Sequence, residues 1–258
     1  MSDAELEVTS ANGVTQLTVN RAKTLNSLTA ALLEDAAAAV RAAGADPAVR
    51  VVVLTGVGRA FSSGAELGAI PDHPRGRIAT LEAGNDLVEA ITVCPKPVVA
   101  VVNGLAVGIG ATIALACDLV VARRSSYFLL AFVNIGLMPD GGATALVPAA
   151  IGRARAARMA MLGERIPADT ALEWGLISHV VDDAEFETEV AAIIDELAHS
   201  ATAAIAATKA ALADATLTSL RQAHATEREG QLELFQTHDH VEGVAAFQQK
   251  RPAQFRGH

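Results

Sequence analysis

The stretch PVVAVVNGLAVGIGATIALACDLVVA, residues 97–122, decides the fold class of this chain. Residues 97–104 read as a buried strand, and the turn AVGIG at residues 106–110 leads into an Ala-rich helix. A second apolar strand, LVVA, follows at residues 119–122. A strand, a Gly-rich turn, a helix and a further buried strand, in this order, predict an α/β fold.

The Gly-rich turn also suits an anion or a developing oxyanion. A helix that begins directly after the turn leaves unpaired backbone N–H groups at the positive end of the helix dipole. Gly108 and Gly110 would let a ligand approach the backbone closely. No Gly-Lys-Ser/Thr follows, and Ile113 stands where a GxGxxG pattern needs its third glycine, so a nucleotide-phosphate loop is disfavoured. A purely structural turn is the alternative to a functional one.

Length and composition bound the function. The 258 residues suit one large α/β domain, or one domain with a small appendage. Hydrophobic residues make up 51% and aromatic residues 3%, which predicts a core of Ala, Val, Leu and Ile. The formal net charge is −9 and no basic stripe is visible, which argues against a nucleic-acid partner. An anionic small ligand would need local Lys or Arg side chains to offset this field.

Neither the cysteines nor the first residues indicate a metal, a disulfide framework or export. Cys94 and Cys117 lack metal-type spacing. The opening MSDAELEVTS has neither the basic nor the apolar region of a secretion signal. Apolar runs are of strand length or are broken by polar residues and glycine. We therefore expect no membrane span and a cytoplasmic protein.

The N-terminal part continues the α/β pattern. Asn-Gly at residues 12–13 predicts a hairpin turn between two strands, and VRVVVLTG at residues 49–56 predicts a buried strand of the parallel type. Asn26 or Ser27 is expected to cap the helix that follows. GRAFSSGAEL, residues 58–67, reads as a loop that leads into a helix.

The C-terminal part is almost wholly helical after a last buried strand at residues 176–181. We therefore expect an α/β core over residues 1–199 and a helical region over residues 200–258.

Five segments follow one another in an order that one family shares. They are NRAKTLNSL (residues 20–28), GRAFSSGAEL (58–67), VVNGLAVGIGATIALACDLVVA (101–122), NIGLMPDGGAT (134–144) and ALEWGLISHVV (171–181). Together they resemble the crotonase superfamily, the enoyl-CoA hydratase/isomerase family, over nearly the whole chain. The resemblance implies a spiral of ββα units, with a C-terminal helical region that builds homotrimers or dimers of trimers.

The resemblance implies an acyl-CoA thioester as substrate, with coenzyme A as part of that substrate and no tightly bound cofactor. Family members hold the thioester oxygen between two backbone N–H groups, and the matching positions here are Ala65 and Ile109. Removing a proton beside a thioester makes an enolate whose charge collects on that oxygen, and each preorganised donor is worth roughly 10²–10³ in rate. Ile109 stands where the family usually has glycine.

The resemblance also assigns residues to the two ends of the substrate. The implied contacts with coenzyme A are Arg21, Lys23, Leu25, Ser63 and Lys250. The implied wall of the acyl pocket consists of Leu67, Thr112, Phe132 and Met138. Cationic side chains suit the phosphates of coenzyme A. A solvated loop and an ordinary surface lysine are the alternative interpretations of these cations.

One carboxylate stands where hydratases of this family use two glutamates. Thr112 and Phe132 occupy the positions that match those glutamates, and neither can serve as a base for water. Asp140, in LMPDGG, matches the sole catalytic base of some isomerases. The segment resembles the phenylacetate-pathway and Δ3,Δ2-enoyl-CoA isomerases more than the hydratases. This resemblance predicts double-bond isomerisation, with Asp140 as the proton shuttle.

Two other functions stay open at this point. The chain could be an enoyl-CoA hydratase that uses Asp140 with a second, unidentified group. It could also be an acyl-CoA-binding protein that keeps the oxyanion pocket without catalysis. For Asp140 itself, the alternative role is that of a turn or helix-capping residue before GGAT.

Overall fold

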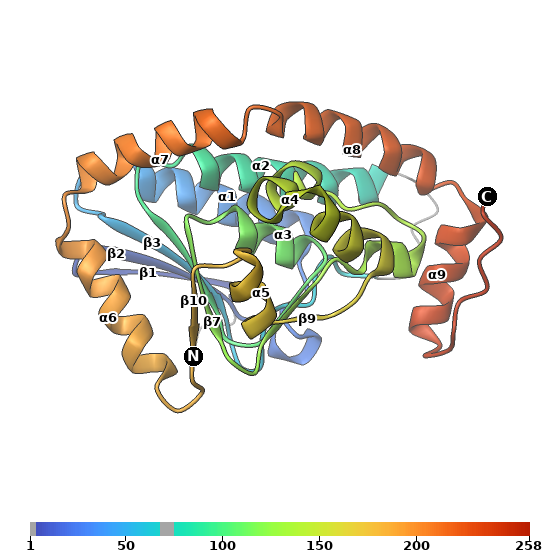
Figure 1. Cartoon of the computed structure of the whole chain (residues 1–258), viewed down its shortest axis with the longest axis horizontal. Helices are drawn as coiled ribbons and strands as arrows, with labels where there is room; N and C mark the ends of the chain where they lie inside the picture. The colour runs from blue at the N-terminus through green and yellow to red at the C-terminus, as the bar shows by residue number, and fades with distance from the viewer. Residues whose placement is uncertain (1–3, 68–74) are drawn as a thin grey trace.

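The computed structural model describes residues 4–67 and 75–258, and these form two β-sheets flanked by helices (Figure 1). Within these residues the large sheet has the strand order β1-β2-β3-β5-β7-β10 and the small sheet has the order β4-β6-β8-β9. The pairs β1/β2 and β8/β9 are antiparallel, and the other neighbours are parallel. The strands are β1 (Leu6–Ala11), β2 (Val14–Val19), β3 (Val51–Gly56), β4 (Ala60–Ser62), β5 (Val98–Val102), β6 (Leu105–Val107), β7 (Leu119–Arg123), β8 (Tyr127–Leu129), β9 (Ile166–Pro167) and β10 (His179–Val181).

The helices cover the sheets and then form the C-terminal part of the chain. They are α1 (Ala30–Ala45), α2 (Arg75–Val93), α3 (Ile109–Ala116), α4 (Ala143–Leu162), α5 (Ala168–Trp174), α6 (Phe186–His199), α7 (Thr202–Thr216), α8 (Leu220–Leu234) and α9 (His238–Gln248). Two short 3₁₀ helices, η1 (Ala22–Thr24) and η2 (Ala131–Ile135), lie in the loops. Gly152 interrupts α4 at φ 73°, so α4 consists of two helical parts that meet at a kink.

Successive ββα units each place one strand in the large sheet and the next in the small sheet. β3, β5 and β7 are neighbours in the large sheet, and β4, β6 and β8, which follow them in the chain, are neighbours in the small one. α2 follows β4, and α3 follows β6. This alternation is the spiral of ββα units that the sequence led us to expect.

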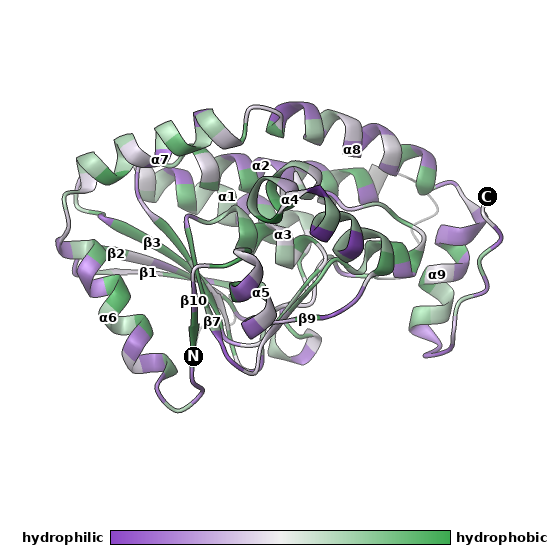
Figure 2. Ribbon diagram, viewed as in Figure 1, coloured by the Kyte–Doolittle hydropathy of each residue, from purple (hydrophilic) through white to green (hydrophobic). Residues whose placement is uncertain are grey.

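The central strands β3 and β5 of the large sheet are buried on both faces, which explains why they are continuously apolar, whereas the edge strand β1 is largely exposed. Successive residues of a strand point to opposite faces, so β3 divides between two cores. Val52 and Leu54 join the core that includes α1, α2 and α3, whereas Val51 and Val53 pack in a second core with Phe186 of α6. Figure 2 shows β3 in hydrophobic colours, whereas β1 and β2 beside it are paler.

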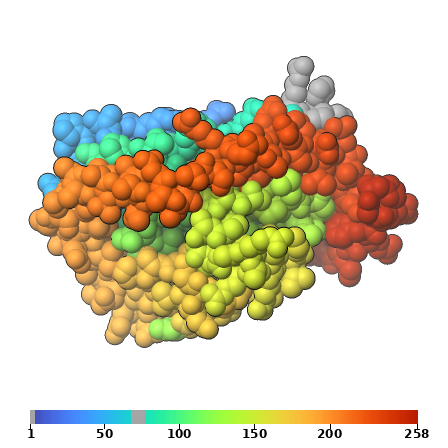
Figure 3. All heavy atoms as spheres, turned by 45° about the horizontal axis from the view of Figure 1, so that its top comes forward, coloured from blue at the N-terminus to red at the C-terminus, as the bar shows by residue number. Residues whose placement is uncertain are grey.

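The C-terminal helices lie on the outside of this core. Figure 3 shows α7 and α8 as one ridge across the molecule, with α9 as a lobe at its end. α9 packs against η2, far earlier in the chain. The division of the chain at residues 199 and 200 stays a prediction.

Two local expectations from the sequence were wrong. Thr29, and not Asn26 or Ser27, caps α1 by accepting a hydrogen bond from the Leu32 N–H at 3.2 Å. Asn26 is unavailable for capping because its buried amide donates to the carbonyl oxygens of Val57 and Ala60. The segment read as a loop at residues 58–67 contains β4, which pairs with β6.

By length and composition, no single helix in the described part of the chain could cross a membrane. α6 and α7 together pass the same test only as a pair bent by 102°.

Candidate active site

A cavity of about 600 Å³ lies where the loop after β4, the start of α3, η2 and α9 meet. The residues predicted for the site that line it are Leu25, Ser63, Ala65, Leu67, Ile109, Phe132 and Asp140. These residues come from five separate segments of the chain, so the fold brings most of the predicted site together.

The backbone N–H of Ala65 points away from the neighbouring segment, which contains Leu28. Leu28 forms an isolated parallel bridge with Ala65, in which the Leu28 N–H donates to the Gly64 carbonyl and the Glu66 N–H donates to the Leu28 carbonyl. In a parallel bridge the residue between these two bonds directs its own N–H to the opposite side. Ala65 lines the cavity, and its N–H points away from Leu28.

The second predicted donor, Ile109, is the first residue of α3. The first N–H groups of a helix have no partner within it, and they lie at the positive end of its dipole. Gly108 precedes it at φ 56° and ψ −131°, a conformation that only glycine adopts readily. A Cβ added to Gly108 would lie 3.9 Å from the Gly64 Cα, so the two donor loops are in contact.

The Ile109 side chain, unusual for this position, is accommodated by two glycines. A Cβ on Gly84 of α2 would lie 3.2 Å from Ile109 Cδ1, and a Cβ on Gly141 would lie 2.4 Å from the same atom. The isoleucine therefore fills space that opposing side chains would otherwise occupy. It also links the turn at Gly108 and Ile109 directly to the loop that carries Asp140.

Asp140 lies in this cavity as a largely desolvated carboxylate. Burial raises its pKa to about 7; a hydrogen bond from Gln231 opposes the rise, and the negative charge of Glu227 adds to it. Gln231 Nε2 donates to Asp140 Oδ2 at 2.9 Å. Oδ1 is buried and has no hydrogen-bond partner among the described residues. A carboxylate with a pKa near neutrality and one uncommitted oxygen is suited to taking up and returning a proton.

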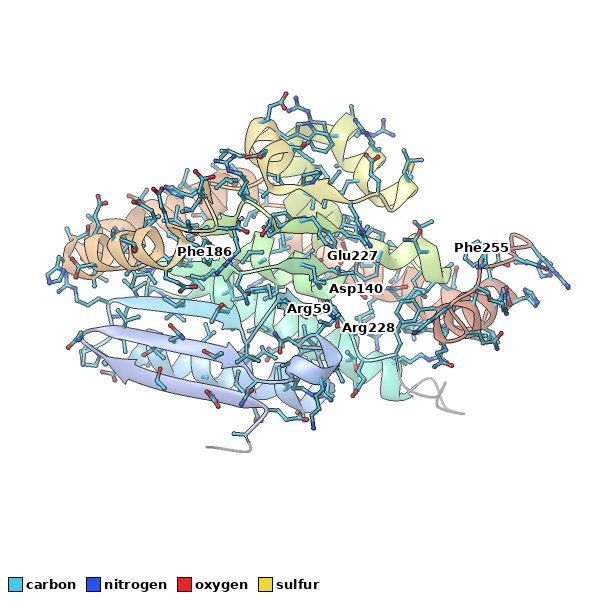
Figure 4. The ribbon with its side chains drawn as sticks, turned by 90° about the horizontal axis from the view of Figure 1, so that it is seen from below. Arg59, Asp140, Phe186, Glu227, Arg228 and Phe255 are labelled. Carbon is cyan, nitrogen blue, oxygen red and sulfur yellow. The ribbon has the colours of Figure 1, made fainter. Side chains whose placement is uncertain are left out.

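The Asp140 side chain does not cap α4, so that half of the alternative interpretation was wrong, but its carbonyl accepts from the Ala143 N–H at 3.3 Å, so Asp140 is also a turn residue. The N-cap is Gly142, and Glu227 of α8 accepts hydrogen bonds from the N–H groups of Gly142 and Thr144 at 2.7 and 2.8 Å. Figure 4 shows Glu227 and Asp140 close to each other in the middle of the molecule. Sequence reasoning missed Glu227 and Gln231, although two polar residues four apart on one helix are the signal of a shared face.

The predicted cations do not line the cavity. Arg21 forms ion pairs with Glu5 and Glu66, each at 3.0 Å, and also donates to the Ser27 carbonyl. Its guanidinium therefore holds the loop before α1 to the loop after β4. Lys23 and Lys250 are exposed at the surface, and their contact with coenzyme A stays a prediction.

Two residues predicted for the acyl pocket lie behind its wall. Thr112 is fully buried, and its hydroxyl donates to the Asp140 carbonyl oxygen at 3.1 Å. The Met138 carbonyl accepts from Gln231, and its sulfur lies against Gly230 of α8. Both residues support the Asp140 loop from outside the cavity.

Arg77 of α2 and residues of the C-terminal part complete the cavity, and the sequence did not point to those of the C-terminal part. Arg77, Phe235, His240, Val244 and Phe247 all line it. His240 Nδ1 lies 2.9 Å from the Ile135 carbonyl, and burial lowers the pKa of this imidazole. No cluster of three or more metal-ligating side chains occurs in residues 4–67 and 75–258.

Known proteins resemble this chain along its length. The sequence profile described as enoyl-CoA hydratase/isomerase matches residues 9–258. A probable enoyl-CoA hydratase of Rhodobacter capsulatus is 42% identical over 246 residues, which cover 95% of each chain. The 1,2-epoxyphenylacetyl-CoA isomerase of Escherichia coli is 38% identical over 250 residues, again 95% of each chain.

Solved structures share the whole architecture. An enoyl-CoA hydratase from Mycobacterium avium subsp. paratuberculosis has a TM-score of 0.93 at 48% identity, and the match covers 98% of this chain and 99% of that one. An enoyl-CoA hydratase/isomerase from Pseudoalteromonas atlantica has a TM-score of 0.88 at 29% identity, covering 98% and 100%. These similarities confirm the expected crotonase fold with its helical C-terminal region. The relatives carry both hydratase and isomerase names, so the names leave the reaction open.

Proposed function

This chain belongs to the enoyl-CoA hydratase/isomerase family, and from that premise we propose that it moves a double bond in an acyl-CoA thioester from position 3 to position 2. The thioester oxygen binds between the N–H groups of Ala65 and Ile109. Asp140 is the single catalytic base. Coenzyme A enters as part of the substrate.

The proposed reaction needs one proton acceptor and no water. The Asp140 carboxylate removes a proton from C2 of a 3-enoyl thioester, and the electron pair of that C–H bond spreads over a dienolate. The two N–H groups stabilise the charge on the thioester oxygen. The protonated Asp140 then returns the proton to C4, which leaves the double bond between C2 and C3 and regenerates the carboxylate.

The observation that carries this proposal is the small number of carboxylates in the cavity. Among the described residues, Glu66 and Asp140 line it, and Glu66 is paired with Arg21 at 3.0 Å. Phe132 presents an apolar ring, and Thr112 is buried behind the wall. Adding water across a double bond requires a base for the water and an acid for the α-carbon. Shifting the double bond requires Asp140 alone.

The test is a pair of turnover assays on Asp140→Asn and on the unchanged protein, with a 3-enoyl-CoA and a trans-2-enoyl-CoA. The unchanged protein is expected to raise the conjugated thioester absorbance with the first substrate and to leave the second unchanged. Asp140→Asn is expected to lose at least about 10³ in kcat because no base replaces the carboxylate. Its binding of a CoA ester should change little.

Asp214→Asn, the same chemical change at an exposed position of α7, is the matched control and should keep full activity. Isomerisation that survives in Asp140→Asn would reject the assignment of the base.

Hydration is the second candidate, favoured by the hydratase names of the relative that is 42% identical and of the structure that is 48% identical. It predicts loss of absorbance from the trans-2-enoyl substrate and formation of 3-hydroxyacyl-CoA. Tight binding of CoA esters without turnover of either substrate would instead indicate an acyl-CoA-binding protein.

A further inference from the structure

Three polar side chains of α8 face the loop that carries Asp140. His224, Glu227 and Gln231 are spaced as i, i+3 and i+7, so they lie on one face of the helix. Glu227 and Gln231 are both fully buried. A Cβ on Gly142 would lie 2.8 Å from His224 Nε2, which places this imidazole against the same loop. Buried polar groups are costly, so a stripe of them on an otherwise apolar face needs an explanation.

Glu227 holds the loop through three donors. Its Oε2 accepts from the Gly142 N–H at 2.7 Å, and its Oε1 accepts from the Thr144 N–H at 2.8 Å and the Thr144 hydroxyl at 2.6 Å. Burial raises the pKa of Glu227, whereas the hydrogen bonds from Thr144 and from the Gly142 N–H oppose the rise and favour the ionised carboxylate. An ionised Glu227 places a negative charge directly behind the Asp140 loop.

Gln231 holds the carboxylate itself. Its Nε2 donates to Asp140 Oδ2 at 2.9 Å and to the Met138 carbonyl at 2.9 Å. One amide group thus fixes both the backbone before Asp140 and one of its two carboxylate oxygens. The other oxygen, Oδ1, is left without a partner among the described residues.

We propose that Gln231 and Glu227 are positioning residues for Asp140, with Gln231 orienting its carboxylate and Glu227 fixing its loop and placing a second negative charge behind it. The proposal rests on the proposed role of Asp140 as the base. The two residues act on that base in opposite directions: the Gln231 hydrogen bond favours the charged form of Asp140, and the Glu227 charge disfavours it.

Other charged or titratable side chains line the same cavity or lie against the loop of Asp140. They are His224 of α8, Arg77 of α2, Glu66 after β4, Arg165 before β9 and His240 of α9. Arg21 pairs with Glu66, and burial lowers the pKa values of His224 and His240, so these imidazoles stay neutral near pH 7. They are the same in every variant below, so they do not affect a comparison between variants.

The experiment measures the pKa of Asp140 twice, by ¹³C NMR of aspartate-labelled protein and by the acid limb of kcat/KM for a 3-enoyl-CoA. The Asp140→Asn spectrum assigns the signal. Gln231→Leu should move the pKa of Asp140 up, and Glu227→Gln should move it down, each by about 0.5–1 pH unit. A purely structural role would lower activity without moving either measured pKa.

Exposed residues of the same helix supply matched controls. Gln222→Leu and Glu229→Gln make the same chemical changes on the solvent side of α8 and should move neither pKa. Glu227→Asp is the substitute if Glu227→Gln does not fold. It keeps the negative charge but moves it back by one methylene, so it should lower the pKa of Asp140 by less than is expected for Glu227→Gln.

The outcomes separate this inference from the proposed function. In one outcome, the NMR pKa of Asp140 rises in Gln231→Leu and falls in Glu227→Gln, but the pKa of the acid limb of kcat/KM does not change. The positioning roles then stand, and Asp140 is not the base. If the NMR pKa of Asp140 does not change, or changes in the same direction in both variants, the inference is overturned, whatever the activity of the variants.

Discussion

At the scale of the residue, Asp140 shows how a side chain acquires a property that its amino-acid type lacks. An aspartate in water has a pKa near 3.9, and burial in this cavity raises it to about 7. The folded protein therefore binds a proton more tightly than the unfolded chain between about pH 4 and pH 7. It follows that Asp140 lowers stability as the pH rises through this range, and the cost is complete above pH 7.

Asp140→Asn should consequently stabilise the fold at about pH 8, because a neutral amide replaces a desolvated charge and can still accept from Gln231. A shift of about three units corresponds to about 4 kcal/mol. We expect about 1–3 kcal/mol, since the residue is only partly buried and solvent in the cavity lowers the cost. Urea unfolding at about pH 8 and pH 4.5 measures the difference.

The gain in the free energy of unfolding should be smaller at about pH 4.5, where the Asp140 carboxyl of the unchanged protein is already protonated. A gain of equal size at both pH values, or a loss at pH 8, would contradict the account of a desolvated Asp140.

At the scale of the element, a buried ion pair attaches α7 to the core. Lys209 Nζ contacts Asp118 Oδ2 at 2.7 Å and also donates to the Ile91 carbonyl at 2.7 Å. Asp118 accepts in turn from the Val98 N–H at the start of β5. The side chains of Lys209 and Asp118 are 7% and 27% exposed, so water screens the pair little. One lysine in an Ala-rich helix thus links α7 to α2, β5 and the end of α3.

Lys209→Met should destabilise the protein by about 2–4 kcal/mol, because it leaves the Asp118 carboxylate buried without its counter-charge. Urea unfolding near pH 7 measures the loss. The double variant Lys209→Met/Asp118→Asn should recover part of it, since both charges are then gone. Lys23→Met, at an exposed position, is the control for the loss of a cation. If the double variant is less stable than Lys209→Met, the buried charge is not the cause.

At the scale of the whole molecule, the cavity depends on the C-terminal helices closing over the core. Phe235, His240 and Phe247 line the same cavity as Leu25 and Ala65, more than 150 residues earlier. The C-terminal helices also carry large apolar side chains at exposed positions: Leu212 of α7 is 60% exposed and Val241 of α9 is 48% exposed. Exposed apolar groups of this size favour contact with another chain.

We therefore keep the prediction of a homotrimer or a dimer of trimers. Sedimentation at micromolar concentration should give a mass near three or six times the 26.6 kDa of one chain. Leu212→Glu should shift the distribution towards smaller species if α7 contributes to the contact, whereas Glu187→Gln on exposed α6 should not. A sedimenting mass of one chain for the unchanged protein would contradict the prediction.

The residue pattern by itself determined the α/β fold class, because strand and helix periodicity are local properties of neighbouring residues. The order of the motifs along the chain determined the family, and the resemblance to that family predicted the two donor loops and the role of Asp140. The sequence pattern did not predict the short strands β4, β6, β8 and β9, because two or three residues are too few to show alternation. The pattern also did not predict the N-cap of α1, because the Asn26 amide donates hydrogen bonds to carbonyl groups 31 and 34 residues away.

Only the tertiary structure decided what surrounds Asp140. Glu227 and Gln231 reach its loop across sequence separations of 85 and 91 residues, and Arg21 is committed to Glu66, 45 residues away. Periodicity predicts that a helix has a polar face, but the packing of whole elements determines what that face meets. The raised pKa of Asp140 is a product of this packing, because desolvation and the charge behind the loop exist only once α8 lies against it.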